Sequence, residues 1–185
     1  MKPHAAFLTL VGIMALSRAD APSPQRVLLV GDSLAIGMSD EFRVLARHSG
    51  MDGRVEAKTG SRIDQWVRWL PAQLAHHRPS LVIVCLGTND MMLADGTRRN
   101  PDLVTILTRE VEQIHAKIMW VGPPKFPNGR LPYEQDIRAI LQQKAPNLYD
   151  SRALDLPGGG DGVHLSPQGY KQWIDAIWRK LEESG

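Results

Sequence analysis

The chain has 185 residues, of which 43% are hydrophobic and 23% are charged, a composition typical of a globular domain with a sizeable core. Its formal net charge is +2, but residues 1–19 supply two basic side chains and no acidic one. Without them the 22 basic residues fall to 20 and equal the 20 acidic ones, so charge gives no reason to expect a nucleic-acid partner. One cysteine excludes an internal disulfide, and no cysteine–histidine spacing indicates a zinc site.

The N-terminal segment has the pattern of a secretory signal peptide. Lys2 precedes an apolar run at 5–16, which is short for a membrane span and is followed by small residues. We expect three parts: a signal peptide at 1–19, cut after Ala19 or Ala21, a linker at 20–25 and a single domain at 26–185. This predicts a secreted or periplasmic protein without a stable membrane span after cleavage. The alternative is that the segment is retained as an N-terminal helix or anchor.

Strand-like and helix-like segments alternate along the rest of the chain. The strand segments are short, mostly apolar runs at 27–30, 55–57, 81–86, 118–121 and 147–150. The helical segments repeat apolar residues every three or four positions, at 38–47, 63–74, 102–115, 133–144 and 166–181. This alternation is typical of an α/β domain with a parallel sheet that helices cover on both faces.

Several residues give sharper local expectations. Pro71 lacks a backbone N–H and is expected to kink or end the helix at 63–74. Ser166 followed by Pro167 predicts the start of the last helix, and Cys85 is expected to be a buried core residue. The helix at 102–115 is expected to bury Leu103, Ile106, Leu107, Val111 and Ile114. Four histidines without an apparent partner are expected to be solvated: His48, His76, His77 and His115.

Polar turns follow three of the predicted strands. These turns are Gly31-Asp32-Ser33, Lys58-Thr59-Gly60 and Gly87-Thr88-Asn89-Asp90. In a parallel sheet they share the carboxyl edge, where open α/β sheets bind their ligands. The loop before the last helix adds Asp161-Gly162-Val163-His164. If this loop closes over the same edge, it brings a histidine and an aspartate next to Ser33.

Ser33, His164 and Asp161 suit nucleophilic catalysis. Ser33 needs a base to take its proton, His164 can accept that proton, and Asp161 can hold the other ring nitrogen. The alternatives are a helix cap for Ser33, a surface histidine for His164 and a cap of the final loop for Asp161.

Three further groups suit an oxyanion hole. The N–H of Gly60, the side-chain amide of Asn89 and the N–H of Ser33 are all hydrogen-bond donors. Asp32 and Asp90 are expected to brace their loops and not to take part in chemistry. We expect no metal and no cofactor.

These blocks resemble the SGNH (GDSL) hydrolase family, which is named for a Ser, a Gly, an Asn and a His. The first block is Gly31-Asp32-Ser33-Leu34 with Gly37, and the others contain Gly60, Asn89 and His164, in the family's order. The resemblance covers 27–170. It implies a flavodoxin-like three-layer α/β/α sandwich with a five-stranded parallel sheet. It also implies ester hydrolysis through an acyl-enzyme without metal or cofactor.

Two other functions stay open at this point. The same triad can pass an acyl group to a sugar hydroxyl, as an O-acyltransferase does, and the same fold can serve as a non-catalytic carbohydrate-binding module. The intact triad argues against the second. The expected partner is a small acyl ester or an acylated glycan or lipid, including lysophospholipids, acetylated polysaccharide or peptidoglycan, and thioesters. Met91, Met92 and Leu93 are candidates to line an acyl pocket, with simple packing of apolar loop residues as the alternative. No oligomeric state is predicted.

Overall fold

Five parallel strands form a sheet with the order β2-β1-β3-β4-β5 in the computed structural model, which describes residues 24–126 and 131–184. The predicted signal peptide at 1–19 and most of the predicted linker lie outside the described residues. The strands are β1 (Arg26–Gly31), β2 (Asp52–Ala57), β3 (Leu81–Cys85), β4 (Lys117–Gly122) and β5 (Leu148–Asp150). The helices are α1 (Ser33–His48), α2 (Ile63–His77), α3 (Asp102–Gln113), α4 (Glu134–Lys144) and α5 (Pro167–Ser184).

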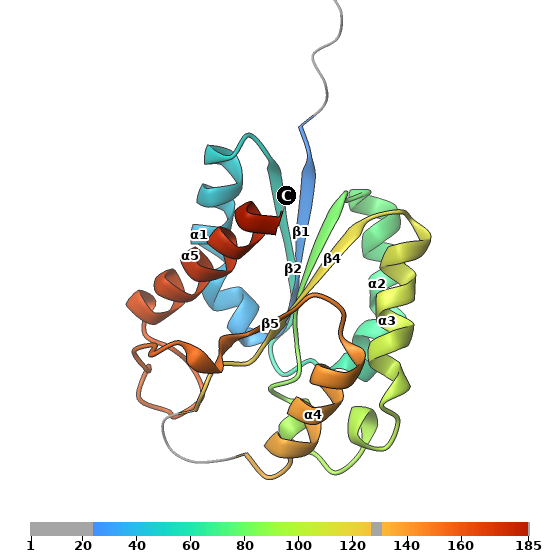
Figure 1. Cartoon of the computed structure of the whole chain (residues 1–185), viewed down its shortest axis with the longest axis vertical. Helices are drawn as coiled ribbons and strands as arrows, with labels where there is room; N and C mark the ends of the chain where they lie inside the picture. The colour runs from blue at the N-terminus through green and yellow to red at the C-terminus, as the bar shows by residue number, and fades with distance from the viewer. Residues whose placement is uncertain (1–23, 127–130, 185) are drawn as a thin grey trace, which may run out of the picture.

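Helices cover both faces of the sheet (Figure 1). Val27 and Leu29 of β1 pack with α1 and α5, whereas Leu28 and Val30 pack with α2, α3 and α4. All four side chains are buried, because a strand between two helical layers has no solvent face. The flavodoxin-like three-layer α/β/α sandwich with a five-stranded parallel sheet is therefore confirmed. Among the described residues, no helix is long and apolar enough to cross a membrane.

The register of the strands aligns the carboxyl ends of β1, β2 and β3. Gly31, at the end of β1, pairs with Ala57 on one side and with Cys85 on the other. The strand order also reverses between β1 and β3, and such a switch point is where open α/β sheets bind ligands. The turns after these strands are therefore brought together at one edge.

Two helices differ from the sequence predictions. Pro71 was expected to kink or end the helix at 63–74, and it does not end α2, which continues to His77. Pro71 is exposed, while Leu70 and Leu74 stay buried in the core. The buried face of α3 is rotated from the predicted one. It includes Val104 and Thr108, whereas two predicted core residues are exposed, Ile106 at 36% and Ile114 at 40%. Thr108 can be buried because its hydroxyl donates to Val104 O and accepts from Trp120 Nε1.

Other local expectations had mixed outcomes. The hydroxyl of Ser166 accepts from the N–H of Gly169 at 3.1 Å, which confirms the predicted cap of α5. Cys85 is buried, as predicted. His77 is not simply solvated, because its Nε2 lies 2.8 Å from Glu56 Oε1 of β2. The other three predicted surface histidines, His48, His76 and His115, are exposed.

Candidate active site

Ser33, His164 and Asp161 form a continuous hydrogen-bonded series. Ser33 is the first residue of α1, directly after the end of β1. Its Oγ lies 2.9 Å from Nε2 of His164, and Nδ1 of His164 lies 2.6 Å from Oδ2 of Asp161. The structure therefore brings together the three residues predicted as nucleophile, base and orienting acid, from positions 131 residues apart in the chain.

The loop that carries His164 is held by its own hydrogen bonds. Oδ1 of Asp161 accepts from the N–H groups of Val163 at 2.9 Å and His164 at 2.8 Å, so Asp161 also caps the loop. The N–H of Gly159 donates back to His164 O at 2.8 Å. The hydrogen bond from His164, with the backbone bonds, lowers the pKa of Asp161, which keeps its side chain a carboxylate. The negative charge of this carboxylate can then stabilise a protonated His164 ring.

Asp32 fixes the start of the helix that presents Ser33. It is the N-cap of α1, and its Oδ1 accepts from the N–H of Leu34 at 2.9 Å. Ser33 follows as the first helical residue, so its own N–H has no partner within the helix. The helix also begins five residues earlier than the predicted 38–47 segment. This places the Ser33 N–H at the positive end of the helix dipole.

Gly60 lies in a tight turn after β2. The N–H of Ser61 donates to Lys58 O at 3.1 Å, and Gly60 has a φ of +74° at the third position of this turn. A positive φ at that position is typical of a type II turn and favours glycine. A side chain there would meet open space, so the backbone conformation and not a packing contact explains this glycine.

The side chain of Asn89 is already engaged. Its Nδ2 donates to Oδ2 of Asp32 and to the carbonyl of Ser61, both at 3.0 Å. An amide nitrogen carries two hydrogens, and both have acceptors in this arrangement. Its predicted place in the oxyanion hole stays a prediction, and donation to a substrate oxygen requires one of these hydrogens to be shared.

Ser61 and Trp66, which the sequence did not single out, and the predicted brace Asp90 hold the same edge together. The hydroxyl of Ser61 donates to Gly31 O at 3.2 Å and accepts from Nε1 of Trp66 at 2.9 Å. Oδ2 of Asp90 accepts from the N–H of Ile63, the first residue of α2. Burial raises the pKa of Asp90, which behaves as a brace, as predicted. In the sequence, Ser61 could have been noticed because it directly follows Gly60. No sequence pattern indicates that Trp66 is its hydrogen-bond partner.

A close approach between α1 and α5 explains the last glycine of the first block. A Cβ atom on Gly37 would lie 2.2 Å from the ring of Tyr170 on α5. Burial raises the pKa of Tyr170 to about 12, so its phenol keeps its proton. This contact seats the start of α5, and with it the His164 loop, against the helix of Ser33.

The predicted acyl-pocket residues separate in the structure. Met91 is fully buried and belongs to the core, so of the two roles considered it packs and does not line a pocket. Met92 and Leu93 are 49% and 40% exposed, and Ile36 of α1 is 44% exposed one turn after Ser33. These three apolar side chains stand on segments that follow the proposed nucleophile and the proposed oxyanion donor.

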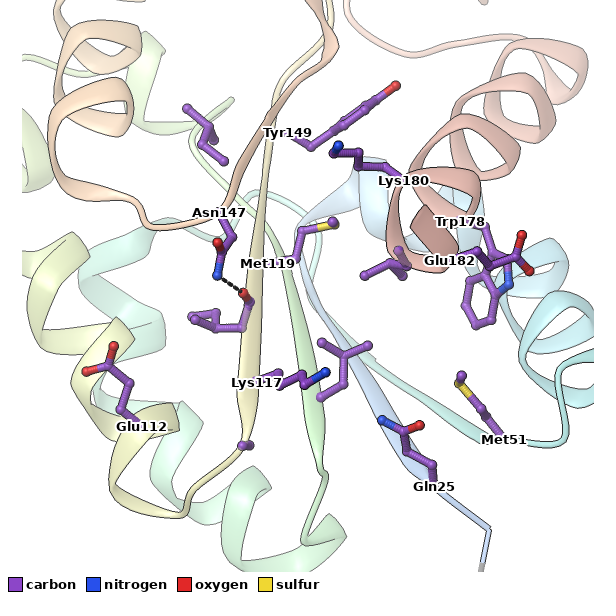
Figure 2. A pocket seen from close by; sticks show the side chains of 15 residues that line it. Gln25, Met51, Glu112, Lys117, Met119, Asn147, Tyr149, Trp178, Lys180 and Glu182 are labelled. Carbon is purple, nitrogen blue, oxygen red and sulfur yellow. Dashed lines mark hydrogen bonds between the residues drawn. The ribbon is translucent and has the colours of Figure 1, made fainter. Parts of the chain in front are cut away.

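A separate hollow of about 750 Å³ lies at the opposite end of the sheet. Figure 2 shows that it is lined by Gln25, by Lys117 and Met119 of β4, and by Trp178 of α5. Since Gln25 and Lys117 stand at the amino ends of parallel strands, this hollow is not part of the Ser33 site. Within 24–126 and 131–184, no group of three or more His, Cys, Asp or Glu side chains is arranged to hold a metal ion.

Comparisons with known proteins give a consistent result. The sequence model of the GDSL-like lipase/acylhydrolase family matches residues 29–172. The structure of TesA is 21% identical with a TM-score of 0.68, over 86% of this chain and 99% of that one. The esterase EstA from Pseudoalteromonas sp., inhibited by monoethylphosphonate, is 16% identical with a TM-score of 0.68, over 86% and 97%. An acetyl xylan esterase, AlAXEase, is 16% identical with a TM-score of 0.66, over 84% and 99%. No curated protein matches the sequence.

Proposed function

Because the chain belongs to the GDSL-like lipase/acylhydrolase family, we propose that it hydrolyses carboxylic esters through an acyl-enzyme on Ser33. The observation that carries the proposal is the hydrogen-bonded series from Asp161 through His164 to Ser33 Oγ. A helix cap or a loop histidine alone does not require that series. The esterases among the structural neighbours support the reaction class.

The first half-reaction acylates Ser33. Its Oγ attacks the ester carbonyl while Nε2 of His164 takes the hydroxyl proton, and the imidazolium is stabilised by the Asp161 carboxylate. The carbonyl oxygen becomes an oxyanion that the N–H groups of Ser33 and Gly60 and the amide of Asn89 stabilise. The tetrahedral intermediate then collapses, and His164 returns the proton to the leaving alcohol.

The second half-reaction releases the acid. Water attacks the acyl carbonyl, His164 takes its proton, and the collapse restores the Ser33 hydroxyl. The side chains of His164 and Asp161 are 42% and 56% exposed, so water reaches the base readily. A sugar hydroxyl, the acceptor in an O-acyltransferase, can reach the same exposed base. Product analysis with an added glycan acceptor distinguishes the two.

An open site suits a small acyl ester or an acyl group on a larger glycan or lipid. The proposed nucleophile is partly exposed, and the apolar Ile36, Met92 and Leu93 are exposed on neighbouring segments. A substrate therefore needs to bury only its acyl group. We further propose that residues 1–19 direct the chain out of the cytoplasm, which the mass of the mature protein would test.

The experiment that tests the proposal is hydrolysis of short p-nitrophenyl esters by the wild-type chain and the Ser33→Ala variant. We expect turnover by the wild type that the variant lacks. Equal, low turnover by both proteins across several acyl lengths would favour the non-catalytic carbohydrate-binding alternative, which glycan binding then checks.

A further inference from the structure

Asp32 connects the proposed nucleophile with a proposed oxyanion donor. Its side chain is 1% exposed, and each carboxylate oxygen has one partner. Oδ1 accepts from the Leu34 N–H of α1, and Oδ2 accepts from Nδ2 of Asn89, which lies 57 residues further along the chain. A helix cap needs only the first bond. The second bond reaches across the switch point between β1 and β3.

The two ends of an amide group differ, so its orientation has consequences. Ser61 O can only accept a hydrogen bond, and so can Asp32 Oδ2 when the carboxyl is ionised, so both oxygens would then repel the amide oxygen of Asn89. An amide turned the other way would present oxygen, and not N–H, near the carbonyl that Ser33 attacks. Oxygen in that place would repel a developing oxyanion instead of stabilising it.

We propose that Asp32 is a positioning residue that acts through Asn89, because its carboxylate keeps the amide nitrogen at the catalytic edge of the sheet. As negative charge develops on the substrate, one hydrogen of Asn89 is shared with the oxyanion. The inference rests on the proposed function of the site, but the orientation of the amide does not depend on turnover.

The charge of Asp32 is sensitive to its surroundings. The groups that face it are Asp90 from the loop after β3, Cys85 of β3, His164 from the loop before α5, and Tyr170 of α5. Burial raises the pKa of Asp32 to about 7. Protonation at Oδ2 removes the acceptor for Asn89, so the amide is held more firmly as pH rises through about 7.

The Asp32→Asn substitution can keep the hydrogen bond from the Leu34 N–H while it removes the acceptor for Asn89. Asparagine caps a helix about as well as aspartate, and its oxygen can keep the Leu34 N–H. Its NH₂ group then faces the Asn89 nitrogen and cannot accept from it, so Asn89 loses the Asp32 acceptor and keeps only the Ser61 carbonyl of its two acceptors. We expect kcat for a short p-nitrophenyl ester to fall about 10-fold or more, within the 100- to 1,000-fold loss expected for Asn89→Ala. The double variant should be no more than about threefold below Asn89→Ala alone. If the kcat of the double variant instead falls by the product of the two single losses, the proposal is overturned.

Asp90→Asn is the matched control, because Asp90 is a second buried carboxylate with no bond to the Asn89 side chain. Its effect on kcat should multiply with that of Asn89→Ala. Equal non-additivity for both aspartates would show a general property of the loop and would contradict the proposal.

A measurement without turnover keeps the proposal testable if the esterase hypothesis fails. We expect the side-chain amide signals of Asn89 in the NMR spectrum to titrate with a midpoint near 7 in the wild type and in Ser33→Ala. The titration should disappear in Asp32→Asn. Asn89 amide signals that change neither with pH nor with the Asp32→Asn substitution would overturn the positioning role. If the chain does not hydrolyse esters but the signals titrate as expected, only the proposed reaction is contradicted.

Discussion

Replacing Asp161 with asparagine tests whether this residue orients the base or only caps a loop. Asparagine keeps one oxygen for the N–H groups of Val163 and His164, which Asp161 now binds through Oδ1. It replaces Oδ2 with an NH₂ group, which cannot accept a hydrogen bond from an N–H on Nδ1 of His164. The ring then carries its proton on Nε2 and cannot take one from Ser33.

The expected loss follows from the exposure of the pair. The wrong histidine tautomer in a buried triad costs about 10⁴-fold in kcat. Here the side chains of Asp161 and His164 are 56% and 42% exposed, so water competes with the carboxylate for the ring. We therefore expect a smaller loss, about 100- to 1,000-fold in kcat/KM. The assay is steady-state hydrolysis of a short p-nitrophenyl ester.

Asp155→Asn is the control for this experiment, since it makes the same charge change in an exposed residue just before the loop. We expect its kcat/KM to equal that of the wild type. If Asp161→Asn stays within about threefold of the wild type, the residue is only a loop cap and the reasoning about the tautomer is refuted.

Three further predictions follow from the same contacts. His164→Ala should lose nearly as much kcat as Ser33→Ala, and the double variant should be little worse than either, because triad members act as a unit. A mild effect of His164→Ala in the ester assay would exclude His164 as the base. Gly37→Ala should lower the Tm because its Cβ meets the Tyr170 ring, and this loss should vanish in a Tyr170→Ala background, whereas an equal loss in both backgrounds would place the cause elsewhere. The folded chain keeps the Asp32 proton between the ordinary pKa of 3.8 and about 7, so wild-type stability falls as pH rises through that range. The Tm of Asp32→Asn relative to the wild type should therefore rise with pH up to about 7, and a constant difference would contradict the shifted pKa.

The fold was predictable because its signals are local. Strands buried between two helical layers are continuous apolar runs, and the segment at 81–86 shows this plainly. The buried face of α3 was less predictable from the sequence. Isoleucine is more hydrophobic than threonine, so the sequence favours burial of Ile106 over Thr108, and the structure shows the reverse. In the structure, Thr108 is buried since Trp120 donates to its hydroxyl. That partner lies on another element.

The contacts of Ser33, His164 and Asp161 could be anticipated from the sequence, whereas the partners of Asn89 could not. Ser33, Gly60 and Asn89 each follow a strand, and strand register brings their turns to one edge. His164 reaches the same edge from the loop before the last helix. The bonds from Asn89 to Asp32 and Ser61 depend on side-chain directions that residue spacing does not encode. The role of Met91 stayed open between pocket and packing for a similar reason, because the direction of its side chain, which is buried in the core, is not encoded in the spacing.

The central claim is that Ser33 is an acyl-accepting nucleophile activated by His164. Its most direct test is the mass of the intact protein after treatment with an activated alkyl phosphonate, followed by peptide mapping. The account predicts one phosphonyl group per chain, on Ser33, with matching loss of ester hydrolysis, no adduct in Ser33→Ala and much slower labelling of His164→Ala. An adduct on another residue, or an unlabelled chain that still hydrolyses esters, would contradict it.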